Sequence, residues 1–199
     1  MVVGVGAIGR QVALQLAAIG MKHMFIYDHD KVAIENLATQ GYREADIGRS
    51  KVEVTWADCS AVNTGLRGFP IADRFRRTSV KDLAEQERVA AFMCVDSIET
   101  RANLWRALRM NAAFYTDGRM SAEMLRVLTA SKPDVDSYYE TTLFAGEEAQ
   151  QGSCTAKSTI YSANIAAGLM VGQFAKWLRN LPVERDIALN LLAMELAVT

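Results

Sequence analysis

The sequence predicts an α/β fold with a doubly wound, mainly parallel sheet. In the first half of the chain, short apolar runs alternate with amphipathic segments, which is typical of strands and helices that follow one another in a parallel sheet. In the second half, Met124–Thr129 and Tyr138–Phe144 are predicted strands without an intervening helix. We therefore expect antiparallel strands to be added to the sheet in the C-terminal half.

The individual elements follow from local patterns. Val89–Val95 is a nearly continuous apolar run, as expected for a strand buried on both faces. Ser50 precedes a helical pattern and has Glu53 three residues later, which predicts a helix start. Ile187–Val198 fits either a helix or a strand. The other predicted strands are Met1–Val5, Met24–Tyr27, Ala72–Arg76 and Ala113–Tyr115. The predicted helices are Ala7–Ile19, Ser50–Val62, Val80–Arg88, Glu99–Met110 and Thr159–Leu178.

Composition limits the class of protein. At roughly 150 residues per domain, 199 residues predict one domain, here residues 1–199. The chain is 50% hydrophobic and 23% charged with a net charge of −1, which argues against disorder and against nucleic-acid or membrane partners. The three cysteines are far apart and form no Cys-x-x-Cys pair, which fits a reducing compartment. We therefore expect a cytoplasmic protein; no signal peptide or membrane-spanning segment is predicted.

A glycine loop is the first motif that indicates chemistry. Gly4, Gly6 and Gly9 form a Gly-x-Gly-x-x-Gly pattern between a predicted strand and a predicted helix. Such a loop turns tightly, lets the backbone approach a phosphate and directs a helix N-terminus at the anion. Asp28 follows Gly9 by 19 residues, where a carboxylate can accept hydrogen bonds from ribose hydroxyls. The pattern predicts a Rossmann-like nucleotide site, does not distinguish NAD from ATP, and has a ligand-free glycine turn as its alternative.

Further motifs follow in a fixed order. They read DHDKV from Asp28, NLATQ from Asn36, DIGRSK from Asp46 and CVDS from Cys94. In this order and spacing they resemble the superfamily of ubiquitin-activating enzymes and the bacterial ThiF and MoeB adenylyltransferases. The resemblance covers Val2 to about Arg101 and resumes over Gly152–Leu178. It implies ATP-dependent adenylation of the C-terminal carboxylate of a small ubiquitin-like protein, sulfur-carrier protein or peptide, and a homodimer or a pseudo-dimer with a related chain.

The resemblance also implies roles for individual residues. Lys51, Asn36 and Gln40 would contact the phosphates of ATP, and Asp28 and Asp30 would lie near the ribose. Asp96 would hold Mg²⁺.

The chemistry of the residues agrees with these roles. A carboxylate is already a nucleophile, so its adenylation requires charge neutralisation on the phosphates rather than a general base. Lys51 supplies a point charge and Asn36 and Gln40 supply neutral donors, whereas Asp96 follows a buried strand and offers the oxygen ligands that Mg²⁺ prefers. Taken singly, Lys51 is also an ordinary lysine at a helix start and Asn36 an ordinary turn residue. Arg101 is better explained as a structural ion-pair partner.

The chain departs from the family pattern at Thr39, where the family has an arginine that contacts ATP, and threonine cannot replace that cation. Arg43, aligned across a one-residue gap, and Arg10 are candidates for the missing charge. The zinc-binding cysteine pairs of ThiF and MoeB are absent, so no zinc is expected.

Cys154 lies in a polar segment, residues 145–158, that is predicted to be a crossover loop before a long helix. Lys157 and the following helix N-terminus favour the thiolate, so Cys154 is a candidate nucleophile for thioester formation. The alternative is a non-catalytic loop thiol. Cys94 and Cys59 are expected to be structural.

Two other functions remain open at this stage. A nicotinamide-dependent oxidoreductase is supported only by the glycine loop and Asp28. A non-catalytic, ATP-binding member of the same superfamily is suggested by Thr39.

Overall fold

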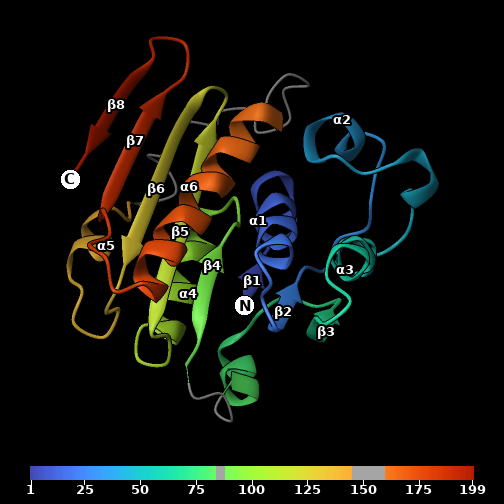
Figure 1. The fold of residues 1–199 in the computed structure, drawn as a ribbon, viewed down its shortest axis with the longest axis horizontal. Helices are drawn as coiled ribbons and strands as arrows, with labels where there is room; N and C mark the ends of the chain where they lie inside the picture. The colour runs from blue at the N-terminus through green and yellow to red at the C-terminus, as the bar shows by residue number, and fades with distance from the viewer. Residues whose placement is uncertain (84–87, 145–159) are drawn as a thin grey trace.

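The computed structural model describes residues 1–83, 88–144 and 160–199, and its ribbon is drawn in Figure 1. The strands are β1 (Val2–Val3), β2 (His23–Tyr27), β3 (Arg67–Ile71), β4 (Ala90–Met93), β5 (Phe114–Ser121), β6 (Met124–Ala130), β7 (Asp186–Asn190) and β8 (Glu195–Val198). The α-helices are α1 (Ala7–Ala18), α2 (Asn36–Gln40), α3 (Lys51–Val62), α4 (Ile98–Leu108), α5 (Tyr138–Thr141) and α6 (Ile160–Leu178). Two 3-10 helices, η1 (Glu44–Asp46) and η2 (Arg77–Leu83), complete the set.

Within the described residues the strands form one sheet in the order β3-β2-β1-β4-β5-β6-β7-β8. The strands from β3 to β5 are parallel, whereas β6, β7 and β8 each pair antiparallel with the preceding strand. The predicted fold class, Rossmann-like with antiparallel strands added in the C-terminal half, is therefore confirmed. Ile187–Val198, which the sequence left ambiguous, contains most of the β7–β8 hairpin.

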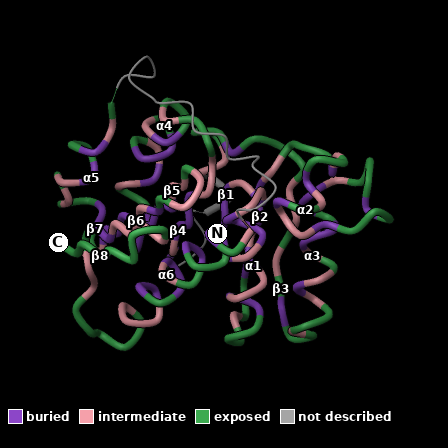
Figure 2. The backbone as a smooth tube through the Cα atoms, turned by 90° about the horizontal axis from the view of Figure 1, so that it is seen from above, coloured by how far each residue is buried: buried purple, intermediate pink, exposed green. Residues whose placement is uncertain are grey.

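Helices cover both faces of the sheet, as the view from above in Figure 2 shows. Helices α1, α3 and α6 lie on one face, and α4 and α5 lie on the other (Figures 1 and 2). The first face packs around Val12, Phe92 and Phe174, and the second around Met93, Trp105 and Tyr115. The central strand β4 contributes to both cores because it is buried on both faces, as its apolar run predicted.

Two predicted strands are wrong in place or type. The strand predicted at Ala72–Arg76 lies earlier, at Arg67–Ile71, where Gly68 and Pro70 concealed it. Proline is tolerated there because β3 is the edge of the sheet. Tyr138–Phe144 is not a strand but contains the short helix α5, whose Tyr139 N–H donates to the Asp136 carboxylate at 3.0 Å.

One helix start and one helix cap differ from the prediction. The helix predicted over Val80–Arg88 corresponds to η2, which begins earlier, at Arg77. Ser50 is the residue before α3, as expected, but its side chain makes no capping hydrogen bond. Its backbone instead forms an isolated bridge with Lys31, which ties the start of α3 to the segment after β2.

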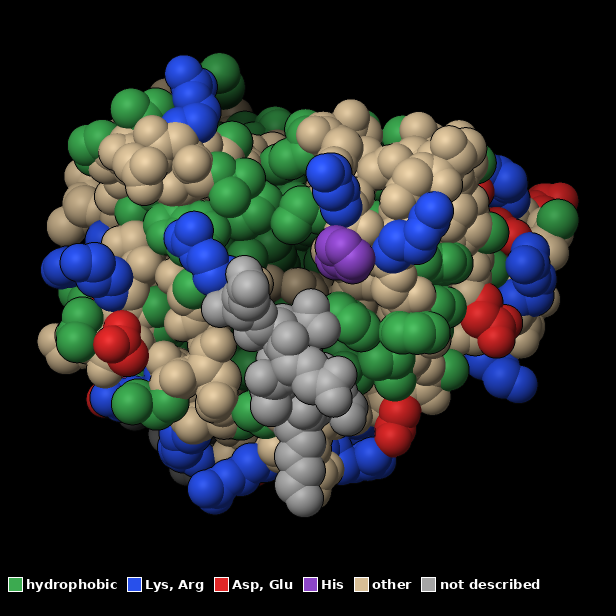
Figure 3. Space-filling view, turned by 60° about the horizontal axis from the view of Figure 1, so that its bottom comes forward, with side chains coloured by type: hydrophobic (Ala, Val, Ile, Leu, Met, Phe, Trp, Pro, Cys, Tyr) green, Lys and Arg blue, Asp and Glu red, His purple; other side chains and the backbone are tan. Residues whose placement is uncertain are grey.

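The two ends of the parallel strands differ in surface character. The carboxyl ends carry the polar loops described below. Figure 3 brings forward the opposite end, where hydrophobic side chains gather among Lys and Arg side chains and few Asp or Glu are seen. Exposed apolar residues at the ends of α1, α3, α4 and α6 are Ile19, Val62, Met110 and Leu178. None of the described helices is long and apolar enough to cross a bilayer.

Candidate active site

The glycine loop joins β1 to α1 at the carboxyl edge of the parallel strands. Gly4 has a φ of +84°, and a Cβ there would lie 2.7 Å from the Cys94 carbonyl oxygen. A Cβ on Gly9 would lie 1.8 Å from the carbonyl oxygen of Gly4. Both positions therefore require glycine, the first for its conformation and the second for close packing.

Helix α1 begins with unpaired backbone donors. Its first backbone hydrogen bond runs from the Arg10 N–H to the Gly6 carbonyl at 3.1 Å. Within the described part of the chain, the N–H groups of residues 6 to 9 have no acceptor. These groups, together with the partial positive charge of the helix N-terminus, form an anion-binding element.

Asp28 follows β2 and holds the glycine loop. One of its carboxylate oxygens accepts the Val5 N–H at 2.8 Å, and the other accepts the Asp30 N–H at 2.9 Å. The carboxylate therefore lies beside the loop and fixes the loop backbone, whereas its predicted contact with a ribose stays a prediction. A carboxylate oxygen keeps a second lone pair for a ligand hydroxyl.

Lys51 and Asp30 meet although 21 residues separate them. The Lys51 ammonium lies 3.2 Å from Asp30 Oδ2, and the Lys51 N–H donates to the Asp30 carbonyl at 3.0 Å. Lys51 is only 6% exposed, while Asp30 is half exposed. The first residue of α3 is thus fixed against the end of β2, close to the loop that Asp28 holds.

Helix α2 carries the two predicted neutral donors. The side-chain oxygen Oδ1 of Asn36 accepts the Ala33 N–H at 2.9 Å. The side-chain NH₂ group of Asn36 is left for another partner. Gln40 reaches the glycine loop, since a Cβ on Gly6 would lie 3.8 Å from its Nε2. The buried Gln40 Oε1 has no hydrogen-bond partner among the described residues. Gln40 and Gly6 are thus neighbours, and Gln40 has an unused acceptor.

Thr39 points into the protein instead. It is 1% exposed, and its hydroxyl donates to the Glu35 carbonyl at 2.9 Å. This intrahelical bond is ordinary for threonine. The position of the family arginine is therefore filled here by a buried, neutral residue.

The two arginines suggested as replacements share one carboxylate. Arg10 donates to Asp58 at 2.7 Å and is 4% exposed, and its guanidinium lies over the Tyr42 ring at 4.3 Å. Arg43 donates to the other Asp58 oxygen at 3.0 Å but is 70% exposed. Arg10 is therefore buried with its guanidinium bound inside the protein. Arg43 forms only a weak surface ion pair with Asp58, and a ligand with a higher negative charge could displace Asp58 from it.

Asp96 lies just beyond β4 and is exposed. In the described ranges its carboxylate has no hydrogen bond or ion pair. Ser97, the next residue, accepts the Thr100 N–H at 3.2 Å and caps α4. Because β4 neighbours β1 in parallel register, Asp96 and the glycine loop leave the sheet at the same edge.

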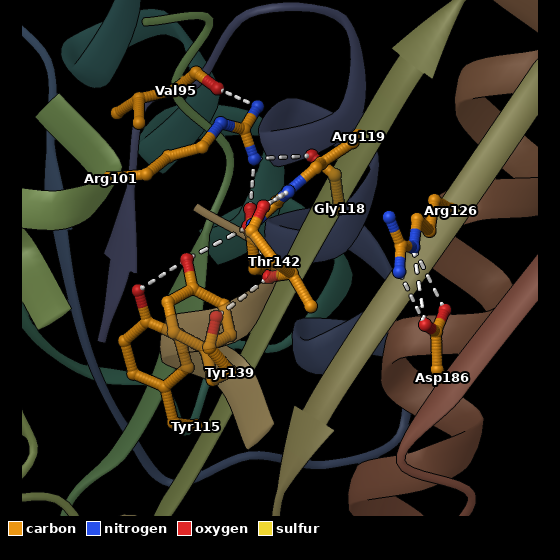
Figure 4. A network of polar contacts seen from close by, with 10 residues as sticks. Val95, Arg101, Tyr115, Gly118, Arg119, Arg126, Tyr139, Thr142 and Asp186 are labelled. Atoms are coloured by element: carbon orange, nitrogen blue, oxygen red, sulfur yellow. Dashed lines mark hydrogen bonds and ion pairs between the residues drawn. The ribbon is translucent and has the colours of Figure 1, made fainter. Parts of the chain in front are cut away.

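A network of buried and partly buried polar side chains, drawn in Figure 4, joins β5 to the start of α4. Asp117 on β5 is fully buried and accepts from Arg101, from Arg119 at 2.8 Å and from the Tyr139 hydroxyl at 2.9 Å. Arg101 also donates to the Val95 carbonyl, next to Asp96. Arg101 is thus a structural ion-pair partner, as predicted, but the sequence analysis missed Asp117. The predicted strand Ala113–Tyr115 ends before Asp117, whereas β5 runs on to Ser121 and buries this carboxylate.

The cysteines differ in what the structure describes. Cys154, and with it the predicted crossover loop 145–158, lies outside the described residues. Burial raises the pKa of the Cys59 thiol to about 12, and burial likewise raises the pKa of Cys94. Both are packed against the core as uncharged thiols, in agreement with the structural role expected for them.

The fold and the loop define a Rossmann-like α/β protein, and comparison with known proteins identifies its family. The model of the ThiF family matches residues 1–197, so the chain belongs to the ThiF family. The resemblance inferred from the motifs is thereby confirmed.

Relatives by sequence include adenylyltransferase and sulfurtransferase MOCS3 of Sus scrofa, 32% identical over 102 residues, which are 51% of this chain and 22% of that protein. Another is the NEDD8-activating enzyme E1 catalytic subunit of Dictyostelium discoideum, 31% identical over 102 residues, which are 51% of this chain and 23% of that protein. The matched region therefore spans less than a quarter of these curated relatives.

Solved structures with the same fold include PaaA, with a TM-score of 0.79 and 18% identity. E. coli MccB with AMPCPP and MccA gives a TM-score of 0.73 and 17% identity. Each match covers all of this chain and 62% of the other chain. At these identities the likeness establishes the fold.

Proposed function

We propose that this chain adenylates the C-terminal carboxylate of a small ubiquitin-like protein, sulfur-carrier protein or peptide with ATP. The observation that carries the proposal is the Lys51–Asp30 contact beside the glycine loop. It supplies a fixed, buried cation where the Gly-x-Gly-x-x-Gly pattern alone supplies only backbone donors. A triphosphate needs such a cation more than the two phosphates of a dinucleotide do.

The donors present suit a triphosphate. The free N–H groups of residues 6 to 9 and the amides of Asn36 and Gln40 supply neutral donors, and Lys51 supplies charge. The Asp96 carboxylate, exposed and without an ion pair among the described residues, suits a hard cation such as Mg²⁺. When bound there, Mg²⁺ would neutralise charge on the phosphate oxygens.

In the proposed reaction a carboxylate oxygen of the carrier attacks the α-phosphorus of ATP. A new oxygen–phosphorus bond forms while the bond from the α-phosphorus to the β-phosphate oxygen breaks, and pyrophosphate leaves. No proton moves in this step, so the reaction requires charge neutralisation by cations and amides rather than a general base. Asp28 and Asp30, at the end of β2, would orient the ribose.

Known proteins support the choice of substrates. The family match and the relatives named adenylyltransferases support nucleotidyl transfer. Structures of E. coli MccB with ATP, and with MccA and AMPCPP, support ATP as one substrate and a separate polypeptide as the other. We propose Arg43 as the cation that compensates for Thr39, because it is exposed and bound only at the surface.

A thioester step on Cys154 belongs to the proposal as a second stage. The Cys154 thiolate would attack the acyl carbon of the adenylate, forming a thioester and releasing AMP. Substitution of Cys154 by serine should abolish any thiol-sensitive carrier adduct and preserve pyrophosphate exchange. Loss of both the adduct and pyrophosphate exchange would show that Cys154 is required for the adenylation step, before any thioester forms.

The test is exchange of labelled pyrophosphate into ATP, which requires a reversible adenylation. We expect exchange only with a carrier that has a free C-terminal carboxylate; the same carrier with an amidated C-terminus is the control. ATP binding without exchange for every carrier tried would favour a non-catalytic member. Tight NADH binding that excludes ATP would favour an oxidoreductase. The homodimer stays a prediction, to be tested by light scattering.

A further inference from the structure

The Val5 peptide lies at the centre of the glycine loop and is held from both sides. Its N–H donates to Asp28 at 2.8 Å, and its carbonyl accepts the Tyr42 hydroxyl at 2.7 Å. The two partners come from residues 23 and 37 positions away along the chain. The Val5 carbonyl would otherwise be free, since the backbone hydrogen bonds of α1 begin only at Gly6.

Tyr42 is itself rigidly placed. It is 5% exposed, its hydroxyl lies 3.1 Å from Thr55 Oγ1 on α3, and the Arg10 guanidinium covers its ring. Burial raises the pKa of Tyr42 to about 12, so the hydroxyl keeps its proton at neutral pH and can donate to Val5. Tyr42 therefore links the glycine loop to both α1 and α3.

The segment that carries Tyr42 also carries Gln40. Gly41, with a φ of +74°, ends α2 in a left-handed turn. Gln40 reaches Gly6 on one side of this turn, and Tyr42 reaches Val5 on the other. Two residues of this segment, Gln40 and Tyr42, thus contact the loop at the adjacent positions Gly6 and Val5.

We propose that Tyr42 is a positioning residue that fixes the Val5 peptide, and with it the free N–H groups of residues 6 to 9, in the orientation that binds phosphate. It touches neither substrate and acts through the loop. The inference rests on the proposed function, because the ligand it orients the loop for is the triphosphate of ATP.

The matched test compares Tyr42→Phe with Tyr115→Phe. Tyr115 is also fully buried and its hydroxyl donates to another tyrosine, Tyr139, at 3.2 Å, but it lies on β5 and packs into the core on the other face of the sheet. Each variant deletes one buried hydroxyl and keeps the ring. We expect Tyr42→Phe to weaken ATP binding by about 3- to 10-fold, the value of one hydrogen bond, and to raise the KM for ATP with little change in kcat. Tyr115→Phe should bind ATP like the unmodified chain.

Amide hydrogen exchange in the absence of nucleotide gives a second readout. Tyr42→Phe should accelerate exchange of the Val5 amide, whereas Tyr115→Phe should not. Equal ATP affinity and equal Val5 exchange in the two variants would overturn the inference. If the unmodified chain binds no ATP, the proposed function fails, and faster Val5 exchange in Tyr42→Phe alone would still support Tyr42 as the residue that fixes the loop.

Discussion

The Lys51 ammonium lies 3.2 Å from Asp30 Oδ2, which joins the first residue of α3 to the end of β2. Lys51 is buried and Asp30 is exposed, so the ion pair points from the interior towards the edge that carries the glycine loop. Asp30 thereby fixes the position of the cation. The proposed contact of Lys51 with the phosphates of ATP depends on this fixed position.

Replacing Lys51 by methionine should reduce pyrophosphate exchange by about 100-fold or more, because a preorganised charge on the phosphates is lost. Methionine keeps most of the side-chain volume. Lys176→Met is the matched control, since Lys176 is likewise paired with a carboxylate, Glu184 at 2.6 Å, but on α6 away from the loop. Similar exchange in both variants would contradict the role of Lys51.

Asp96→Asn should lower the exchange rate by about 100-fold and raise the Mg²⁺ concentration required for half-maximal rate, because an amide binds a hard cation more weakly than a carboxylate. A magnesium titration of the rate measures both effects. Asp73→Asn, at an exposed carboxylate paired with Arg76, should leave the titration unchanged. If Asp96→Asn requires the same Mg²⁺ concentration for half-maximal rate as the unmodified chain, Asp96 is not a metal ligand.

Asp117→Asn should destabilise the fold by about 3 kcal/mol, since removing the carboxylate leaves the buried Arg101 and the partly buried Arg119 without their charge partner. Urea unfolding followed by circular dichroism measures the change. Asp73→Asn again serves as the exposed comparison, for which we expect the same midpoint as the unmodified chain. A midpoint for Asp117→Asn equal to that of the comparison would show that the network contributes nothing to stability.

The Asp186 ion pair predicts a pH dependence of stability. Burial raises the pKa of Asp186, but hydrogen bonds from Arg126 and Tyr138 outweigh burial and hold the pKa below its ordinary value of 3.8. A carboxyl with a lowered folded pKa stabilises the fold above its unfolded pKa, and this stabilisation is lost as pH falls through the folded pKa.

Urea unfolding between pH 6 and pH 2.5 tests this expectation. The free energy of unfolding should fall less steeply below pH 4 in Asp186→Asn than in the unmodified chain. Identical slopes would contradict the expected contribution of Asp186.

Much of the fold follows from local patterns in the sequence. The apolar run around Phe92 and the glycine loop before α1 have single physical explanations, burial on both faces and tight turning, and both are found as predicted. Strand β3 was misplaced because Gly68 and Pro70 oppose strand structure locally and are tolerated only at an edge, which is a property of the whole sheet. Helix α5 was mistaken for a strand because aromatic and threonine residues favour strands, whereas Asp136 caps a helical turn there.

The candidate site was predictable to the level of residue types. Motif order indicated Asp28, Asn36, Gln40, Lys51 and Asp96, and the structure brings Lys51 to Asp30 and Gln40 to Gly6. The contacts of Tyr42 with Val5 and of Asp117 with Arg101 were not predictable, because each joins residues 16 or more positions apart through tertiary packing. Sequence spacing indicates which residues share an edge of the sheet, but not which pairs touch.

The most direct test of the account is a crystal structure of this chain with Mg²⁺ and a non-hydrolysable ATP analogue. We expect the triphosphate over the N–H groups of residues 6 to 9, with the Lys51 ammonium and the Asp96 carboxylate both directed at it. A nucleotide whose phosphates lie away from Lys51 and Asp96, or a glycine loop that stays empty at saturating analogue, would contradict it.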